Sequence, residues 1–347
     1  MTACNAWGTN AADQPLGPLT IERRDLRPED VAIDLTFCGV CHSDLHAARN
    51  DWGRTRYPFV PGHEIIGTVS AIGNAVTKFA PGDTVAVGTI VDSCRRCDAC
   101  LDGEEQYCRE GMVGTYNGTD RIDGSTTYGG YSQSMVVAEP YLLRIPEGLD
   151  PERAAPLLCA GITSYSPLKH WGVGPGSKVG VIGLGGLGHM GVKFAHALGA
   201  EVTMITTSPA KGEDALALGA DHVLISTDKA AMKAATRSFD FLLDTIPVAH
   251  ELAPYLMLLD RAGTLCIVGA IDLLPTFHSG LLLGTQRAVG GSAVGGIAQT
   301  QEMLDLCAAK GIYPECETIR MDEIEHAFGR MEKADVKYRF VIDLATI

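Results

Sequence analysis

The sequence lacks three features, and each absence excludes a class of protein. It has no run of basic residues: 28 Lys and Arg stand against 42 Asp and Glu, which gives a formal net charge of −14. Nucleic-acid phosphates therefore meet no basic patch along this chain. No apolar run reaches the roughly 18 residues that a membrane-spanning helix needs. We expect neither a polyanion-binding protein nor a helical membrane protein.

The N-terminal residues also lack a signal for export. Met1–Gly8 has neither the basic region nor the apolar core of a signal peptide. The chain contains 11 cysteines, an odd number, which without export signals indicates metal ligands and free thiols in a reducing compartment. The expected location is cytoplasmic.

The 347 residues show two successive patterns of predicted secondary structure, and this length suits two domains. Up to about residue 150, short strand-like segments are broken by turns, as at Val31–Leu35 and Ile65–Val69. From about residue 154, strands such as Val179–Ile182 and Val202–Thr206 alternate with helical segments. This alternation predicts an α/β fold with a parallel sheet covered on both faces.

Four cysteines fall within fifteen residues in the pattern C-x2-C-x2-C-x7-C, namely Cys94, Cys97, Cys100 and Cys108. Four thiolates that converge on one point suit a closed, tetrahedral zinc site with bonds of about 2.3 Å. Disulfides and an iron–sulfur cluster are alternatives that the spacing leaves open. The pattern favours a structural zinc ion that holds a loop in shape.

A second candidate metal set comes from distant segments. Cys41, His63 and Cys159 would form a Cys2His group that leaves a fourth position open, as in catalytic zinc sites. Zinc in such a site polarises an oxygen and lowers the pKa of bound water or alcohol. Each residue also has an ordinary interpretation: a buried thiol, a core histidine, or a thiol–disulfide pair of Cys38 with Cys41. Spacing alone leaves these alternatives open.

A glycine-rich segment follows the strand at Val179–Ile182 and fits G-x-G-x-x-G. It opens an amphipathic helix, so its backbone and the helix N-terminus are suited to a dinucleotide pyrophosphate. A glycine-rich turn without a ligand is the alternative. The residues expected at the cofactor are Gly183, Gly185, Gly186, Leu187 and Gly188.

The end of the next strand indicates which dinucleotide binds. An NAD site places an acid there to hold the ribose 2′-hydroxyl. This chain has Thr206, Thr207, Ser208 and Lys211 instead, with no acid among residues 206–211. Hydroxyls and a lysine can bind a 2′-phosphate, which a carboxylate would repel. We expect NADP rather than NAD, unless Lys211 is simply a solvated residue at the start of a helix.

Five motifs occur together along the chain: Gly39-Val40-Cys41-His42-Ser43-Asp44-Leu45-His46, Pro61-Gly62-His63-Glu64, the four-cysteine segment, Tyr128-Gly129-Gly130-Tyr131 and Gly183–Gly188. In this order, from about residue 15 to Asp343, the chain resembles the zinc-containing medium-chain alcohol dehydrogenases. The resemblance is to their cinnamyl alcohol dehydrogenase-like branch, which includes bacterial broad-range NADPH-dependent aldehyde reductases.

The resemblance implies a mostly-β GroES-like catalytic domain at residues 1–153 and 292–347, and a doubly wound Rossmann domain at residues 154–291. It implies two zinc ions per chain and a homodimer. Cys41, His63 and Cys159 would hold the catalytic zinc, and the four-cysteine set the structural one.

The resemblance also assigns roles to other residues. Glu64 matches an acid beside the ligand histidine, Asp44 would accept a hydrogen bond from a zinc-bound histidine, and Ser43 and His46 match a proton relay. Less securely, Trp52 would line the substrate pocket and Arg339 would contact a phosphate. The nicotinamide end of the cofactor would meet Thr163, Val268 and Gly269.

The function implied is NADP(H)-dependent interconversion of primary alcohols and aldehydes by hydride transfer, with the substrate oxygen on the catalytic zinc. The same fold with a preference for NAD is one alternative. A non-enzymatic zinc protein or a redox sensor that uses Cys38 and Cys41 is another. The partner expected is a small alcohol or aldehyde, and no nucleic acid or membrane.

Overall fold

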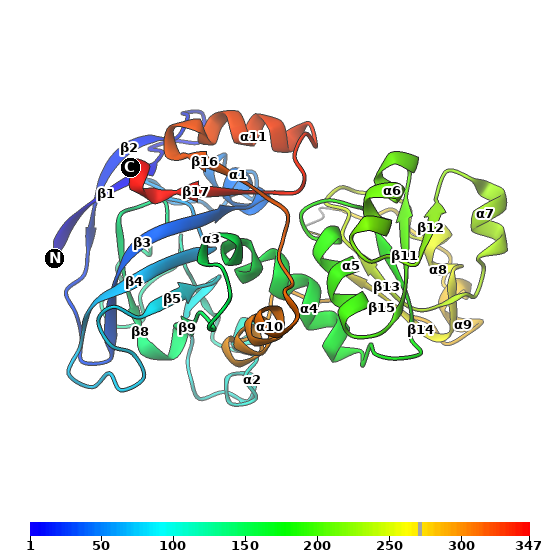
Figure 1. Cartoon of the computed structure of the whole chain (residues 1–347), viewed down its shortest axis with the longest axis horizontal. Coiled ribbons are helices and arrows are strands. Elements are labelled where there is room, and N and C mark those ends of the chain that lie inside the picture. The colour runs from blue at the N-terminus through cyan, green and yellow to red at the C-terminus, as the bar shows by residue number, and fades with distance from the viewer. Residues whose placement is uncertain (270–272) are drawn as a thin grey trace. The chain divides into compact units, whose positions relative to one another are not determined.

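The chain is described here by a computed structural model that covers residues 1–269 and 273–347, and it divides into two compact units (Figure 1). Unit 1 contains Met1–Cys159 and Gly295–Ile347, and unit 2 contains Ala160–Val294. The first break lies after Cys159 rather than after residue 153, because the 3-10 helix η3 (Ala155–Leu158) contacts the sheet of unit 1. The second break lies after Val294 rather than after residue 291.

Unit 1 is built around a mainly antiparallel sheet with the strand order β16-β17-β3-β4-β5-β9, to which β8 adds by pairing with β3. Two short pairs, β1 with β2 and β6 with β7, lie outside this sheet. The strands are β1 (Thr2–Gly8), β2 (Gly17–Arg23), β3 (Asp30–Val40), β4 (Ile65–Ile72), β5 (Thr84–Val87), β6 (Ile90–Asp92), β7 (Val113–Gly114), β8 (Ser134–Ala138), β9 (Leu143–Arg144), β16 (Cys316–Arg320) and β17 (Arg339–Asp343).

Strand β3 shows how the sequence builds this core. Val31, Ile33 and Leu35 alternate along the strand and are buried, as expected where one face of a sheet meets the core. The pairing with β4 shifts register after Leu35, so that Cys38 and Val40 continue the buried row. This row ends directly before Cys41.

The C-terminal segment completes the same sheet. β17 pairs antiparallel with β3, with Phe340 opposite Val40, and parallel with β16. The helices of unit 1 are α1 (His42–Ala48), α2 (Asp98–Leu101), α3 (Pro151–Ala154), α10 (Ile297–Lys310) and α11 (Ile324–Glu332).

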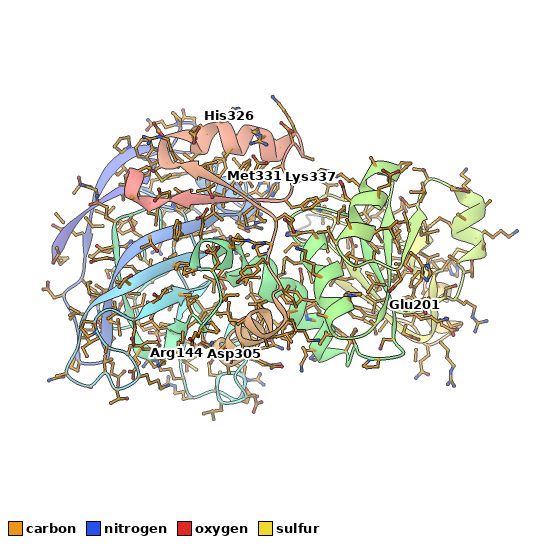
Figure 2. The ribbon with its side chains drawn as sticks, viewed as in Figure 1. Arg144, Glu201, Asp305, His326, Met331 and Lys337 are labelled. Carbon is orange, nitrogen blue, oxygen red and sulfur yellow. The ribbon has the colours of Figure 1, made fainter. Side chains whose placement is uncertain are left out.

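Helix α10 packs on β9 through a polar contact as well as apolar ones. The backbone N–H of Arg144 donates to the Gln301 side chain, which in turn donates to the Arg144 carbonyl and to Asp305. Figure 2 labels Arg144 and Asp305 at this contact. The segment Gly295–Ile347 thus contacts the N-terminal part of unit 1 at two places: α10 contacts β9, and β17 pairs with β3.

Unit 2 is a parallel sheet with the strand order β12-β11-β10-β13-β14-β15. Counted from the first strand, this is the order 3-2-1-4-5-6 of the Rossmann fold, in which the strand order reverses beside β10. The elements are α4 (Ala160–His170), β10 (Lys178–Ile182), α5 (Gly188–Ala197), β11 (Glu201–Thr206), α6 (Pro209–Ala217), β12 (His222–Ile225), α7 (Lys229–Ala234), β13 (Phe239–Asp244), α8 (Ala253–Leu256), β14 (Leu259–Ile267), α9 (Gly280–Leu283) and β15 (Ala288–Gly291).

The core of unit 2 follows from its apolar strands. Val179, Val181 and Ile182 of β10 are all buried, as is typical of a strand with neighbours on both sides and helices on its faces. Helices α5 and α6 contact β11. The expected α/β class with a parallel sheet is therefore confirmed. Within the described residues, no helix has the length and apolar character needed to cross a bilayer.

Candidate metal centres and nucleotide site

Four potential metal ligands from distant parts of unit 1 meet at one point. Cys41 follows β3, His63 and Glu64 precede β4, and Cys159 follows η3. Their ligand atoms all lie within 4.8 Å of one another. The Cys41 and Cys159 sulfurs are 3.9 Å apart, close to the roughly 3.8 Å expected for two sulfurs on a tetrahedral ion with 2.3 Å bonds. The donor set and its spacing fit zinc.

The pKa values of the two thiols in this group are shifted in opposite directions. A hydrogen bond from the Cys159 thiol, together with His63 nearby, lowers the pKa of Cys41 well below its ordinary range. The same contact with Cys41, together with burial, raises the pKa of Cys159. The lowered pKa of Cys41 favours its thiolate, which is the form that binds a metal.

Asp44 organises the approach of two ligands to this point. Its fully buried carboxylate accepts hydrogen bonds from the backbone N–H of Cys41, at 2.9 Å, and of Gly62, at 3.0 Å. Its Oδ1 also lies 3.0 Å from Nδ1 of His63. Since a carboxylate accepts only, Nδ1 carries the proton and Nε2 is left as the ligand atom.

Glu64, the fourth residue of this group, is paired with Arg339. Both side chains are buried, and Nη2 of Arg339 donates to Oε1 of Glu64. Burial raises the pKa of Glu64 to about 7, although the charge of Arg339 opposes that shift. The guanidinium of Arg339 is therefore directed at Glu64, whereas the sequence had suggested a phosphate for it.

The expected proton relay lies on α1, directly after Cys41. His46 is 39% exposed at its side chain, and its Nδ1 lies 2.7 Å from Oδ2 of Asp51. The ring of Trp52 stands beside it, with centroids 5.7 Å apart. Ser43 lies three residues before His46 on the same short helix and is partly exposed. His46 is thus held between Asp51 and Trp52 at the protein surface.

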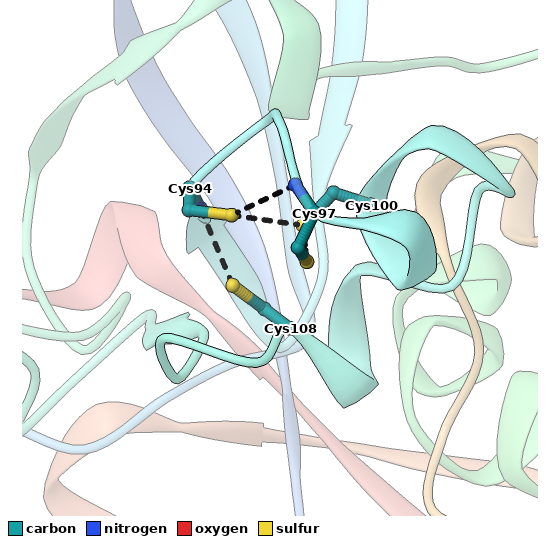
Figure 3. Close-up of side chains that lie close together, drawn as sticks. All are labelled: Cys94, Cys97, Cys100 and Cys108. Atoms are coloured by element: carbon teal, nitrogen blue, oxygen red, sulfur yellow. Dashed lines mark hydrogen bonds between the residues drawn. The ribbon is translucent and has the colours of Figure 1, made fainter.

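The four cysteines of the other set also converge, as Figure 3 shows. The sulfurs of Cys94, Cys97, Cys100 and Cys108 lie within 4.8 Å of one another, and two of the separations are 3.8 Å and 3.5 Å. All four thiols are free. A disulfide would bring two sulfurs to about 2.05 Å, so the geometry fits a single tetrahedral ion and not a pair of disulfides.

Backbone N–H groups point at these sulfurs. The N–H of Cys97 donates to Cys94, that of Cys94 to Cys108, and that of Arg109 to Cys97, at 3.3–3.4 Å. Hydrogen bonds from Arg109 and Cys100 lower the pKa of the Cys97 thiol to about 6. Such donors stabilise thiolates, so the loop is shaped for an ion even before one binds.

In unit 2, the glycine-rich loop has the three roles expected of a dinucleotide fingerprint. Gly183 has a φ of +89°, a conformation that favours glycine and turns the chain out of β10. A Cβ on Gly188 would collide with the carbonyl oxygen of Gly183, so α5 packs closely on the strand. A Cβ on Gly185 would meet nothing within 4 Å. This open side suits close approach of a pyrophosphate.

The loop is held from the neighbouring strand. The hydroxyl of Thr245, which follows β13, donates to the carbonyls of Ile182, at 2.8 Å, and Gly183, at 3.0 Å. Because the strand order reverses between β10 and β13, Thr245 fixes the loop at the point where dinucleotides bind in this fold.

At the end of β11, the expected hydroxyls differ in their surroundings. Thr206 is 6% exposed, and its Oγ1 accepts from the N–H of Ser208. Ser208 caps α6 by accepting from the N–H of Lys211. Thr207 is exposed, and Lys211 is partly exposed on the first turn of α6. Thr207, Ser208 and Lys211 therefore present a cluster suited to a phosphate, while Thr206 shapes the turn.

The remaining cofactor candidates also lie in unit 2. The N–H groups of Val268 and Gly269, after β14, reach the carbonyl of Asp244. Oγ1 of Thr163 on α4 is buried and has no hydrogen-bond partner among the described residues. An orphaned buried hydroxyl is costly unless a ligand satisfies it. The residues of unit 2 thus fit a dinucleotide.

Comparison with known proteins now identifies the family. Residues 27–147 match the alcohol dehydrogenase GroES-like domain and residues 186–309 match the zinc-binding dehydrogenase domain. The chain belongs to the zinc-binding alcohol dehydrogenase family. It is 53% identical to aldehyde reductase YahK of Escherichia coli (strain K12), over 99% of this chain and 98% of that protein. It is 50% identical to NADP-dependent alcohol dehydrogenase C 1 of Mycolicibacterium smegmatis, over 100% and 99%.

Solved structures agree with this assignment. A cinnamyl alcohol dehydrogenase from Sorghum bicolor superposes with a TM-score of 0.95 at 45% identity, over 99% of this chain and 98% of that one. A structure named as CAD from Helicobacter pylori complexed with NADP(H) gives a TM-score of 0.92 at 39% identity, over 99% of this chain and 98% of that one. The predicted family and the GroES-like and Rossmann folds are confirmed, and the chain is an oxidoreductase.

The structure of this dehydrogenase adds residues that the sequence motifs did not single out. Asp51 contacts His46 although it lies beyond the end of α1, so helical spacing does not predict the pair. Tyr131 belongs to a recognised motif, but only the fold shows that its hydroxyl donates to Asp44, at 3.3 Å. Thr245 had no motif at all.

Proposed function

We propose that the protein is a zinc- and NADP(H)-dependent alcohol dehydrogenase and aldehyde reductase, which interconverts primary alcohols and aldehydes by hydride transfer. The observation that carries this proposal is the convergence of Cys41, His63 and Cys159 on one point, with a candidate proton relay on the helix that follows Cys41. The glycine-rich loop and the acid-free end of β11 in unit 2 support NADP(H). Relatives named as aldehyde reductase and NADP-dependent alcohol dehydrogenase support the reaction.

The chain's own residues would each contribute a defined part of the chemistry. Zinc held by Cys41, His63 and Cys159 would supply Lewis acidity towards a substrate oxygen. Asp44 keeps His63 in the tautomer that leaves Nε2 free to bind. His46, with Nδ1 facing Asp51, is placed to pass a proton between the region of Ser43 and solvent.

Three finer statements belong to the same proposal. The four-cysteine set would hold a second zinc ion, because four thiolates complete a tetrahedral shell and leave no position for substrate. Two zinc ions per chain follow. The homodimer expected from the family resemblance, and the cytoplasmic location expected from the N-terminal residues and the cysteines, stay predictions.

The test is a panel of aromatic and aliphatic aldehydes assayed with NADPH and with NADH. We expect turnover with NADPH to exceed turnover with NADH. Lys211→Glu should lower the ratio of kcat/KM for NADPH to that for NADH by about tenfold or more, because a charge-assisted hydrogen bond to a phosphate contributes about 1.5–3 kcal/mol. Lys229→Glu, the same charge change at the start of exposed helix α7, is the matched control.

Two outcomes would contradict the proposal in different ways. If the unmodified enzyme uses NADH and NADPH equally, the proposed preference for NADP is wrong, and the proposed reaction still stands. No turnover of any aldehyde with either cofactor, in protein that contains zinc, would remove the reaction itself.

A further inference from the structure

Arg23, at the end of β2, is a buried arginine with four side-chain hydrogen bonds to residues 128–134. The residue is 9% exposed. Its Nε donates to the carbonyl of Ser134 at 2.9 Å, and Nη1 donates to that of Tyr128 at 2.7 Å. Nη2 donates to the carbonyl of Gly129 at 2.8 Å and to the hydroxyl of Ser132 at 2.7 Å. One guanidinium thus spans residues 128–134.

These partners are all neutral, which is unusual for a buried cation. Burial lowers the pKa of Arg23 to about 10, so the side chain stays charged at neutral pH. Burying a charge is costly unless hydrogen bonds replace its hydration, and here backbone carbonyls supply most of them. The neighbouring Arg24 differs, because it forms ion pairs with Asp30 and Asp120.

The turn that Arg23 spans lies directly on the segment before His63. The N–H groups of Gly129, Gly130 and Tyr131 donate to the carbonyls of residues 60, 62 and 61, respectively, at 2.9–3.0 Å. A Cβ on Gly129 would collide with the carbonyl of Pro61, so the two backbones touch. Gly62 has a φ of +101°, and a Cβ there would meet the backbone N of Tyr131 at 2.8 Å.

Both segments then reach the same carboxylate. The Tyr131 hydroxyl donates to Oδ2 of Asp44 at 3.3 Å, and the N–H of Gly62 donates to Oδ1 at 3.0 Å. Asp44 in turn faces Nδ1 of His63. A displacement of the turn would therefore move both the backbone that carries His63 and the carboxylate that orients its ring.

We propose that Arg23 is a positioning residue for the metal ligand His63: its guanidinium holds the 128–134 turn, and the turn sets the backbone at residues 60–62 and the position of Asp44. This inference rests on the proposed zinc site at Cys41, His63 and Cys159. Arg23 touches neither the ligands nor a substrate, so its effect on the metal passes through the turn.

The experiment compares Arg23→Met with Arg24→Met, which removes the adjacent arginine from partners outside the turn. Two readouts are taken on the intact protein: the rate at which a chromogenic chelator removes zinc, and the visible spectrum with Co2+ in place of zinc. His63→Ala identifies the phase of zinc release that belongs to this site. We expect Arg23→Met to release that zinc about tenfold faster, as outer-shell changes do, and to alter the Co2+ bands. Arg24→Met should lower stability and leave both readouts unchanged.

A failure of this inference is distinguishable from a failure of the proposed function. If the unmodified protein holds no metal that His63→Ala removes, the proposed zinc site is wrong. If the unmodified protein holds that metal, and Arg23→Met has the same zinc-release rate and Co2+ spectrum as the unmodified protein, only the positioning role is wrong. If Arg23→Met does not fold, Arg23→Lys is tested in its place, because lysine keeps the positive charge but lacks the planar guanidinium with its several N–H donors. Intermediate release and altered bands support the role, and unmodified values overturn it.

Discussion

Asp44 illustrates how a single residue can organise a site from several segments of the chain. It is fully buried, and it accepts from the backbone before α1, from the backbone before β4 and from the His63 ring. A buried carboxylate needs such donors to offset its lost hydration. The same three contacts that stabilise Asp44 therefore fix two metal ligands.

At this scale, Cys159→Ala should abolish turnover, since a lost thiolate weakens the metal site, while the nucleotide loop in unit 2 is untouched. We expect metal analysis to fall from about two zinc ions per chain to about one, and NADPH binding measured by fluorescence to persist. The control is Cys38→Ala, which removes another buried thiol outside the ligand group. Substantial activity in Cys159→Ala would count against its role as a ligand.

At the scale of elements, the four-cysteine segment also contacts a helix that is distant in sequence. Glu105 lies between Cys100 and Cys108, and its Oε2 accepts from the N–H of Ile297 at 3.1 Å. Ile297 is the first residue of α10, whose own N-cap, Gly296, has no side chain. The four-cysteine loop thus supplies a carboxylate to the N-terminus of a helix far away in sequence, where the carboxylate accepts from a free N–H and interacts favourably with the helix dipole.

We accordingly expect Glu105→Ala to lower the free energy of unfolding by about 1 kcal/mol, the usual cost of a lost helix cap. Glu104→Ala, an exposed neighbour, should have no measurable effect. In a Cys97→Ser background that cannot hold the loop, the cost of Glu105→Ala should disappear, as measured by denaturant unfolding. An undiminished cost in that background would show that the cap does not depend on the metal loop.

At the scale of the whole molecule, unit 1 is made from two separate stretches of chain. Met1–Cys159 supplies every candidate metal ligand, and Gly295–Ile347 supplies β17, which pairs with the end of β3 beside Cys41. Stability of the metal region therefore depends on segments that are distant in sequence, and on charges distributed over the surface of the unit.

One of those charges gives a pH dependence. Burial alone would raise the pKa of Asp120, but hydrogen bonds from Arg27 and from backbone N–H groups lower it from 3.8 to about 2. A carboxyl with a depressed pKa stabilises the folded state above pH 4 and loses that contribution as the pH falls towards 2. Its size is on the order of 2 kcal/mol.

Asp120→Asn should therefore destabilise the protein at pH 7, and the difference from the unmodified protein should shrink between pH 4 and pH 2. Urea unfolding at a series of pH values measures this difference. Asp13→Asn, an exposed control, should show little difference at any pH. A difference for Asp120→Asn that stays constant down to pH 2 would contradict the assigned shift.

The sequence by itself was sufficient where function depends on short spacings. The four cysteines lie within one loop, and the glycine-rich loop lies between one strand and one helix, so local backbone geometry largely decides where their atoms go. The α/β alternation likewise predicted the parallel sheet. Cys41, His63 and Cys159 formed a candidate set that only the family resemblance favoured over its alternatives, because nothing in their spacing requires them to meet.

Only the tertiary structure decided the long-range partners. In the fold, Arg339 pairs with Glu64 and Asp51 contacts His46. Arg23 binds the 128–134 turn, which in turn contacts the segment before His63. Each of these pairings depends on which polar groups become buried together, and burial is set by the packing of whole sheets and not by neighbouring residues. The residues of the two local motifs could therefore be predicted from the sequence, whereas the polar partners that hold the site residues in place could be identified only from the tertiary structure.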